Sequence, residues 1–134
     1  MLCTKNKQYL FDIDTHELIQ LESPIKEEIT YIAKSTNNQY FLASSHKIYC
    51  ARLNHGRLEV IKHPELDNFH IVNYIYFHPE TQMLVIGTLL DGIYLYNIHS
   101  RQLIDVHNGL QDINVNSIIA SKENENEVLI ATNG

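Results

Sequence analysis

The sequence predicts an all-β fold: a β-propeller of about three blade-equivalents, each a four-stranded antiparallel meander, arranged as an incomplete ring. The first observation behind this prediction is a repeat. Residues 29–32, 72–75 and 115–118 read ITYI, VNYI and VNSI, and each starts 43 residues after the one before. The second observation is that further short apolar segments follow each of these at nearly constant spacing. A period of about 40–45 residues with several short strands per unit is typical of propeller arrays.

Three more elements complete each repeat. The second element covers residues 41–45, 84–88 and 128–132, at offsets of 43 and 44 residues. The third covers residues 8–13, 48–53 and 93–98, and the fourth is marked by Leu18, Leu58 and Leu103, both at offsets of 40 and 45. Because the order is kept over four consecutive elements, the repeat predicts one recurring structural unit.

Each element reads as a β-strand. The elements are rich in Ile, Val, Tyr, Phe and Leu and are bounded by Asn, Asp, Gly, Ser or His, which is typical of strands and turns. The fourth element interleaves charged residues with Leu and Ile, as expected of an outer strand with a solvated side. No long apolar pattern has a 3.6-residue period, so we expect no long helix, and at most a short helical turn at 24–28 or 64–68.

The repeat also divides the chain. Residues 1–28 are expected to end one blade, 29–71 and 72–114 to form two further blades, and 115–134 to start the next. Blades stabilise each other by stacking, and a closed ring normally needs at least four. We therefore expect a partial propeller that self-associates through unpaired strands or pairs with the rest of the propeller.

Composition restricts the partners. The net charge is −6, with 16 acidic and 10 basic residues and no basic cluster, which argues against nucleic acid. The longest apolar stretch is too short for a membrane span, and no signal peptide is visible at the start. Cys3 and Cys50 both fall within apolar strand segments, so we expect free structural thiols.

The sequence contains no convincing catalytic or metal-binding motif. The eight histidines lack the spacing of known zinc templates, and most fall in or near predicted turns. His63 and His107 occupy equivalent repeat positions, which favours a structural role in the crossover between blades. Ser44-Ser45-His46 lacks a nucleophile elbow. We predict a non-enzymatic segment with no catalytic residue, no metal site and no cofactor.

Mostly neutral polar side chains fall at one rim of the predicted sheets, where the first strand of each repeat starts and the second ends. Amide and hydroxyl groups both donate and accept hydrogen bonds, which suits the hydroxyls of carbohydrates, and Tyr74 and Tyr76 add ring faces. The alternative is that these residues cap the ends of the sheets and satisfy backbone groups. The candidate ligand-binding residues are Thr30, Asn73, Thr88, Asp91, Asn116, Thr132 and Asn133.

Several segments resemble two-component regulator propeller repeats. Residues 108–119, NGLQDINVNSII, are similar to the Asn-Gly-Leu segment that opens such a repeat. Residues 84–88 (LVIGT), 128–134 (VLIATNG) and 91–97 (DGIYLYN) resemble the strands that follow it, although the Trp usual in that family is absent. The resemblance implies a periplasmic sensor domain of a hybrid two-component histidine kinase, with an oligosaccharide as its signal.

A second family gives the same fold with a different function. Residues 77–84, FHPETQML, resemble the Phe-Ser-Pro-Asp turn of WD40 repeats, and residues 95–98, LYNI, resemble the Leu-Trp-Asp strand. The Gly-His and Trp-Asp pairs of that family are missing. This alternative implies a cytoplasmic scaffold for protein–protein interaction. A propeller glycosidase or lyase is a weaker alternative, because it needs a pair of well-placed carboxylates.

Overall fold

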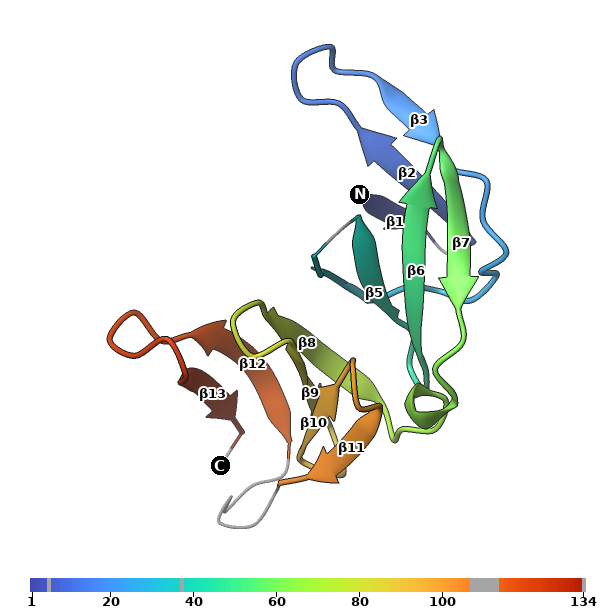
Figure 1. The fold of residues 1–134 in the computed structure, drawn as a ribbon. Helices are drawn as coiled ribbons and strands as arrows, with labels where there is room; N and C mark the ends of the chain where they lie inside the picture. The colour runs from blue at the N-terminus through green and yellow to red at the C-terminus, as the bar shows by residue number, and fades with distance from the viewer. Residues whose placement is uncertain (5, 37, 107–113, 134) are drawn as a thin grey trace.

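The computed structural model describes residues 1–4, 6–36, 38–106 and 114–133, and these form an all-β chain of four antiparallel sheets. Figure 1 shows the sheets following one another in chain order. Neighbouring strands within a sheet are consecutive in the chain, and none of the sheets closes on itself. The strands are β1 (Leu2–Thr4), β2 (Lys7–Phe11) and β3 (Leu18–Gln20) in the first sheet, β4 (Tyr31–Lys34), β5 (Gln39–Ala43), β6 (Ile48–Asn54) and β7 (Arg57–Ile61) in the second, β8 (Val72–His78), β9 (Met83–Thr88), β10 (Ile93–Asn97) and β11 (Gln102–Asp105) in the third, and β12 (Val115–Ala120) and β13 (Val128–Thr132) in the fourth.

The described residues contain one helical element, the short 3₁₀ helix η1 (Pro64–Leu66), where a helical turn was expected. The other expected turn, at 24–28, was wrong, because that segment forms no helix. It belongs to the link between the outer strand β3 and the inner strand β4. The link must cross from the outer strand to the inner strand of the next sheet, and an extended segment covers a given distance with about half the residues that a helix needs. Ile25 and Ile29 also fix this link by burying their side chains under the second sheet.

The strand pairing corrects two of the predicted alignments. Ile32 pairs with Leu42, and its repeat equivalent Ile75 pairs with Ile86, so the second element is offset by 44 residues rather than 43. A slip of one residue would put every side chain on the wrong face. The third repeat keeps 44, because Ile118 pairs with Ile130.

The fourth element is also shifted in the second sheet. Ala51 pairs with Val60, whereas its equivalent Tyr96 pairs with Leu103, so Val60 rather than Leu58 corresponds to Leu103. The strands β6 and β7 form a longer hairpin, and Leu58 lies two residues nearer its turn. Two residues along a strand lie on the same face, so Leu58 still points into the core.

Successive sheets pack face to face through three apolar clusters. One cluster lies between the first and second sheets, a second between the second and third, and a third between the third and fourth. The second sheet contributes alternate side chains to both of its neighbours: Leu42 faces the first sheet, and Phe41 faces the third. Both residues have no exposed surface. This explains why the inner strands are apolar almost without interruption.

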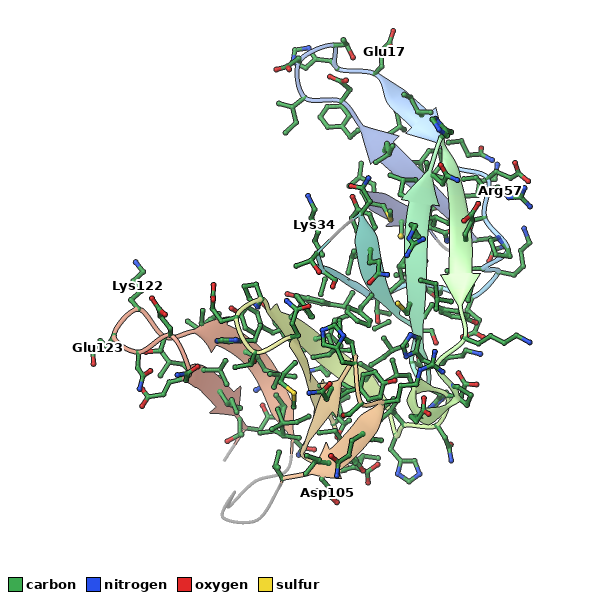
Figure 2. All side chains as sticks on the ribbon, in the orientation of Figure 1. Glu17, Lys34, Arg57, Asp105, Lys122 and Glu123 are labelled. Atoms are coloured by element: carbon green, nitrogen blue, oxygen red, sulfur yellow. The ribbon has the colours of Figure 1, made fainter. Side chains whose placement is uncertain are left out.

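The outermost strands of the second and third sheets, β7 and β11, are half polar, as the sequence predicts. In β7, Arg57 and Glu59 are exposed while Leu58 between them is buried. The labelled charged side chains in Figure 2, among them Arg57 and Asp105, lie at outer strands, turns and strand ends. Charges at these positions keep the outer edges solvated and discourage pairing with another strand.

Candidate functional site

The inner strands of three successive sheets lie side by side. β4 contacts β8, and β8 contacts β12. Between β4 and β8 is an open groove of about 220 Å³. Its lining includes three tyrosines, Tyr31, Tyr74 and Tyr76, together with Lys34 at the end of β4. The stacking of the sheets thus brings aromatic rings from two repeats into one groove.

Tyr31 and Tyr74 form the closest ring pair in this groove. Their ring centroids are 4.2 Å apart and the planes are inclined by 43°. Burial, and then hydrogen bonding with Tyr74, raise the pKa of Tyr31 well above its usual value, so the Tyr31 phenol stays neutral at physiological pH. Tyr31 was not among the tyrosines that the sequence predicted to offer a ring face to a ligand. The repeat itself contains the signal that would have found it, because Tyr31 and Tyr74 are both the third residue of their aligned segments.

The three candidate asparagines lie where β8, β12 and the end of β13 meet. The amide nitrogen Nδ2 of Asn73 donates to the carbonyl oxygen of Val115 at 2.6 Å, which ties β8 to β12. The side chain of Asn116 donates to the Oδ1 atom of Asn133, which follows β13. Thr132 ends β13 directly opposite Val115. Asn116 and Asn133 are exposed, so their remaining donor and acceptor positions face outward.

The other candidates are held by backbone contacts at the sheet ends. Thr30 donates from Oγ1 to the carbonyl oxygen of Ala43 at 3.3 Å. Thr88 has no exposed surface; its Oγ1 donates to the carbonyl oxygen of Gly92 at 3.0 Å and accepts from the backbone N–H of Asp91 at 2.9 Å. Thr88 therefore shapes the turn between β9 and β10, as the capping alternative expects.

Asp91 is positioned by this turn. Its Oδ2 atom lies 2.8 Å from Nδ1 of His70, in a pair where the His70 side chain is 71% exposed and the Asp91 side chain 29%. An exposed pair of this kind contributes little to stability. Its carboxylate can accept hydrogen bonds from a ligand's hydroxyl groups at the rim.

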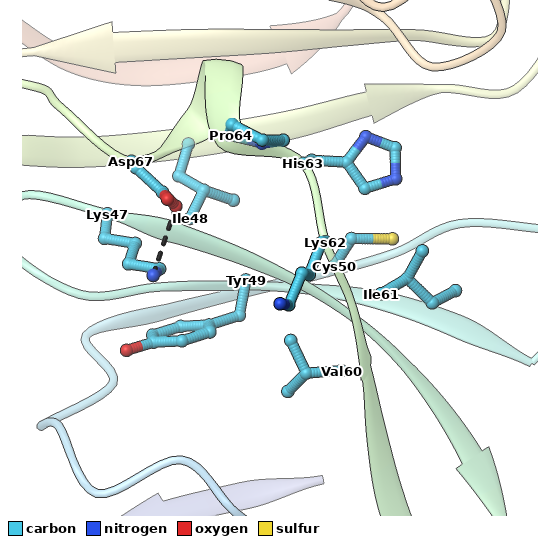
Figure 3. Close-up of a pocket in the computed structure, with 10 residues that line it drawn as sticks. All are labelled: Lys47, Ile48, Tyr49, Cys50, Val60, Ile61, Lys62, His63, Pro64 and Asp67. Carbon is cyan, nitrogen blue, oxygen red and sulfur yellow. Dashed lines mark ion pairs between the residues drawn. The ribbon is translucent and has the colours of Figure 1, made fainter.

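A second cavity, of about 310 Å³, lies where β6 begins and β7 ends, beside η1 (Figure 3). Lys47 forms an ion pair with Asp67 at 3.1 Å, and its ammonium group lies 4.8 Å from the centre of the Tyr49 ring. The Tyr49 hydroxyl donates to Glu27 at 2.6 Å, and this hydrogen bond is the main cause of a lowered pKa of Glu27. The cavity contains none of the predicted site residues, and the charge of Lys47 is already balanced within the chain.

His63 has the structural contacts expected of a crossover residue. Its Nδ1 atom lies 2.6 Å from the hydroxyl of Tyr96, which is buried in the third sheet, and the two rings meet edge to face. The equivalent His107 lies outside the described residues. Among the residues that the structure describes, no group of three His, Cys, Asp or Glu side chains is arranged to hold a metal ion. Cys3 and Cys50 are both free, as expected.

Comparison with known proteins does not assign the chain to a family: it matches no protein-family model and no curated protein sequence. Over the described residues, no helix is long and apolar enough to cross a membrane.

Proposed function

We propose that this chain is a non-catalytic, ligand-binding segment of a β-propeller, in which the inner edge of the stacked sheets binds an oligosaccharide. The single observation that carries the proposal is the groove between β4 and β8, with Tyr31, Tyr74 and Tyr76 in its lining. Tyrosine rings present apolar faces that suit the C–H faces of sugar rings, while their hydroxyls form hydrogen bonds. The exposed Asn116 and Asn133 extend this mixed surface along the inner edge.

The chemistry of the inner edge favours binding over hydrolysis. Glycoside hydrolysis ordinarily uses two carboxyl groups on either side of the scissile bond. Asp91 is the single carboxylate among the candidate residues, and it is paired with His70. Amides and hydroxyls bind neutral hydroxyl groups without activating them. This composition supports a sensing role rather than a catalytic one.

The resemblance of residues 84–97 and 108–134 to two-component regulator repeats extends the proposal to a periplasmic sensor that reports the bound oligosaccharide to a histidine kinase. In this arrangement the propeller segment binds the signal, and the kinase chemistry belongs to a separate domain.

A WD40-type protein–protein scaffold is the second candidate, and the turn at residues 77–84 favours it. His78 is buried there, accepts a hydrogen bond from the backbone N–H of Thr81 at 3.3 Å, and contacts the carbonyl oxygen of Glu125 in the turn between β12 and β13. These contacts of His78 fix a compact turn between the two inner strands, as the resemblance to WD40 repeats would imply. This candidate accounts for the turn but does not use the tyrosine groove.

Calorimetric titration with defined hexasaccharides, of β-1,4-glucan, α-1,4-glucan and β-1,4-xylan, tests the proposal. We expect at least one of the three to bind, and Tyr74→Ala to weaken its binding by about 5–10-fold, as the loss of one aromatic contact of about 1–1.5 kcal/mol would. Tyr9→Ala is the matched control, because Tyr9 is also partly buried but lies in the first sheet, outside the groove. Absence of binding to all three sugars, or equal weakening by Tyr9→Ala, would contradict the proposal and favour the scaffold.

A further inference from the structure

Large apolar side chains are exposed on the outer face of the first sheet. Leu2 in β1 and Phe11 in β2 are 52% and 46% exposed. Leu18, which pairs with Phe11 across the sheet, is 56% exposed. By strand pairing, these side chains point away from Cys3 and Leu10, which pack against the second sheet.

The same repeat positions are buried in the other sheets. Leu2 corresponds to Leu42 and Ile86, because each of the three pairs with an equivalent tyrosine on the neighbouring strand. Leu42 and Ile86 have no exposed surface. Phe11 lies two residues after the tyrosine of its own repeat, as Ala51 and Tyr96 do in theirs. Ala51 and Tyr96 are also fully buried. In the second and third sheets, this face is covered by the preceding sheet.

The fourth sheet has the opposite face uncovered. Leu129 and Ile119 pair with each other and are 59% and 52% exposed. Leu129 corresponds to Phe41 and Val85, which are 0% and 4% exposed because the following sheet covers them. Ala131 on the same face corresponds to Gly87, whose small size admits the next inner strand.

We propose that two copies of this chain associate head to tail, with the fourth sheet of one copy packed on the first sheet of the other. The two exposed faces are the two halves of an interface that the chain already forms three times between its own sheets. The second copy therefore continues an existing packing arrangement rather than creating a new one. A pair joined at both such faces contains eight sheets, which lies within the range of about four to eight blades in closed propellers, whereas a third copy would exceed it. A head-to-tail interface that closes in this way gives a finite pair rather than a filament.

This inference rests on the packing faces and is independent of the ligand. It also differs from association by strand exchange, which would join the free edges of β1 or β13 and leave both apolar faces exposed.

Light scattering combined with size-exclusion chromatography tests the pair. We expect the chain to have about twice its mass of 15.5 kDa. Leu18→Glu and Leu129→Glu, on the two opposite faces, should each produce a monomer. Leu90→Glu is the matched control, because Leu90 is 55% exposed but lies in the turn between β9 and β10, outside both faces. This variant should keep the double mass. Far-UV circular dichroism checks that each variant keeps its strands.

Mixing the two monomeric variants tests the head-to-tail geometry. One junction in such a mixture has both native faces, so a species of double mass should reappear. Three results would overturn the proposal. They are a monomeric wild-type chain, a series of larger assemblies, or a monomer for only one of the two variants while the other keeps the double mass. The last result would indicate that one face pairs with itself.

Discussion

Replacing Gly87 by alanine should destabilise the packing of the fourth sheet on the third. A Cβ atom at Gly87 would lie 2.5 Å from Cγ1 and 2.9 Å from Cβ of Val115, and 3.3 Å from Cδ1 of Ile118. Carbon atoms in contact are ordinarily about 3.5–4.0 Å apart, so Val115 would have to retreat by about 1 Å. Val115 has no exposed surface and a β-branched, stiff side chain, which leaves it little room to adjust.

The expected cost is about 1–3 kcal/mol of unfolding free energy, the usual penalty for overpacking a core. Its cause is steric, because Gly87 is not among the residues with positive φ. Urea unfolding followed by far-UV circular dichroism measures it as a lower midpoint with an unchanged slope.

Two further variants isolate this cause. Val115→Ala removes the methyl groups that clash, so Gly87→Ala should cost at least about 0.5 kcal/mol less in that background. Gly56→Ala is the control, because Gly56 has open space around it but a φ of +79°, so its cost comes from the backbone and should not depend on Val115. An unchanged midpoint for Gly87→Ala, or strictly additive costs with Val115→Ala, would refute the steric reasoning.

Two other predictions concern one buried and one partly buried polar group. Gln8 is fully buried with no hydrogen-bond partner for either amide atom, while its repeat equivalent is Ile48, so Gln8→Ile should raise the unfolding free energy by about 1–2 kcal/mol; a lower urea midpoint would show that the amide is needed. Burial, and to a smaller degree Arg101, lowers the pKa of His63, against the opposing effect of Glu65. The unfolded chain then binds the proton more tightly, so stability should fall as the pH drops below about 6.5. This part of the pH dependence should be absent in His63→Gln, and identical pH profiles of unfolding free energy for the two proteins would contradict it.

The existence of the strands could be predicted because their apolar pattern is local, but their alignment between repeats could not. The periodic segments predicted the inner strands of each sheet, including β13 from its first residue to its last. The faces depend on turn lengths, however, and a pair such as Ile32 and Leu42 is separated by one residue fewer than Ile75 and Ile86. Single-residue differences of this kind are invisible to a period of about 43 but reverse every side chain.

The candidate site was predictable in position and less so in detail. Asn73 and Asn116 lie at the strand starts where the repeat put them. Whether a polar side chain there faces a ligand or its own backbone depends on side-chain torsions, which the sequence does not encode locally; Thr88 satisfies the turn instead. The tyrosine groove required knowledge that β4 and β8 are neighbours, since its rings come from residues 43 positions apart.

The most direct test of the proposed function is to map a bound sugar on the protein by amide chemical shifts. A titration of the isotopically labelled chain with the three hexasaccharides should move the resonances of β4 and β8 around Tyr31 and Tyr74, and those near Asn116, while β7 and η1 stay unchanged. Shifts confined to the cavity beside Lys47 and Asp67, or no shifts with any of the sugars, would contradict binding at the inner edge.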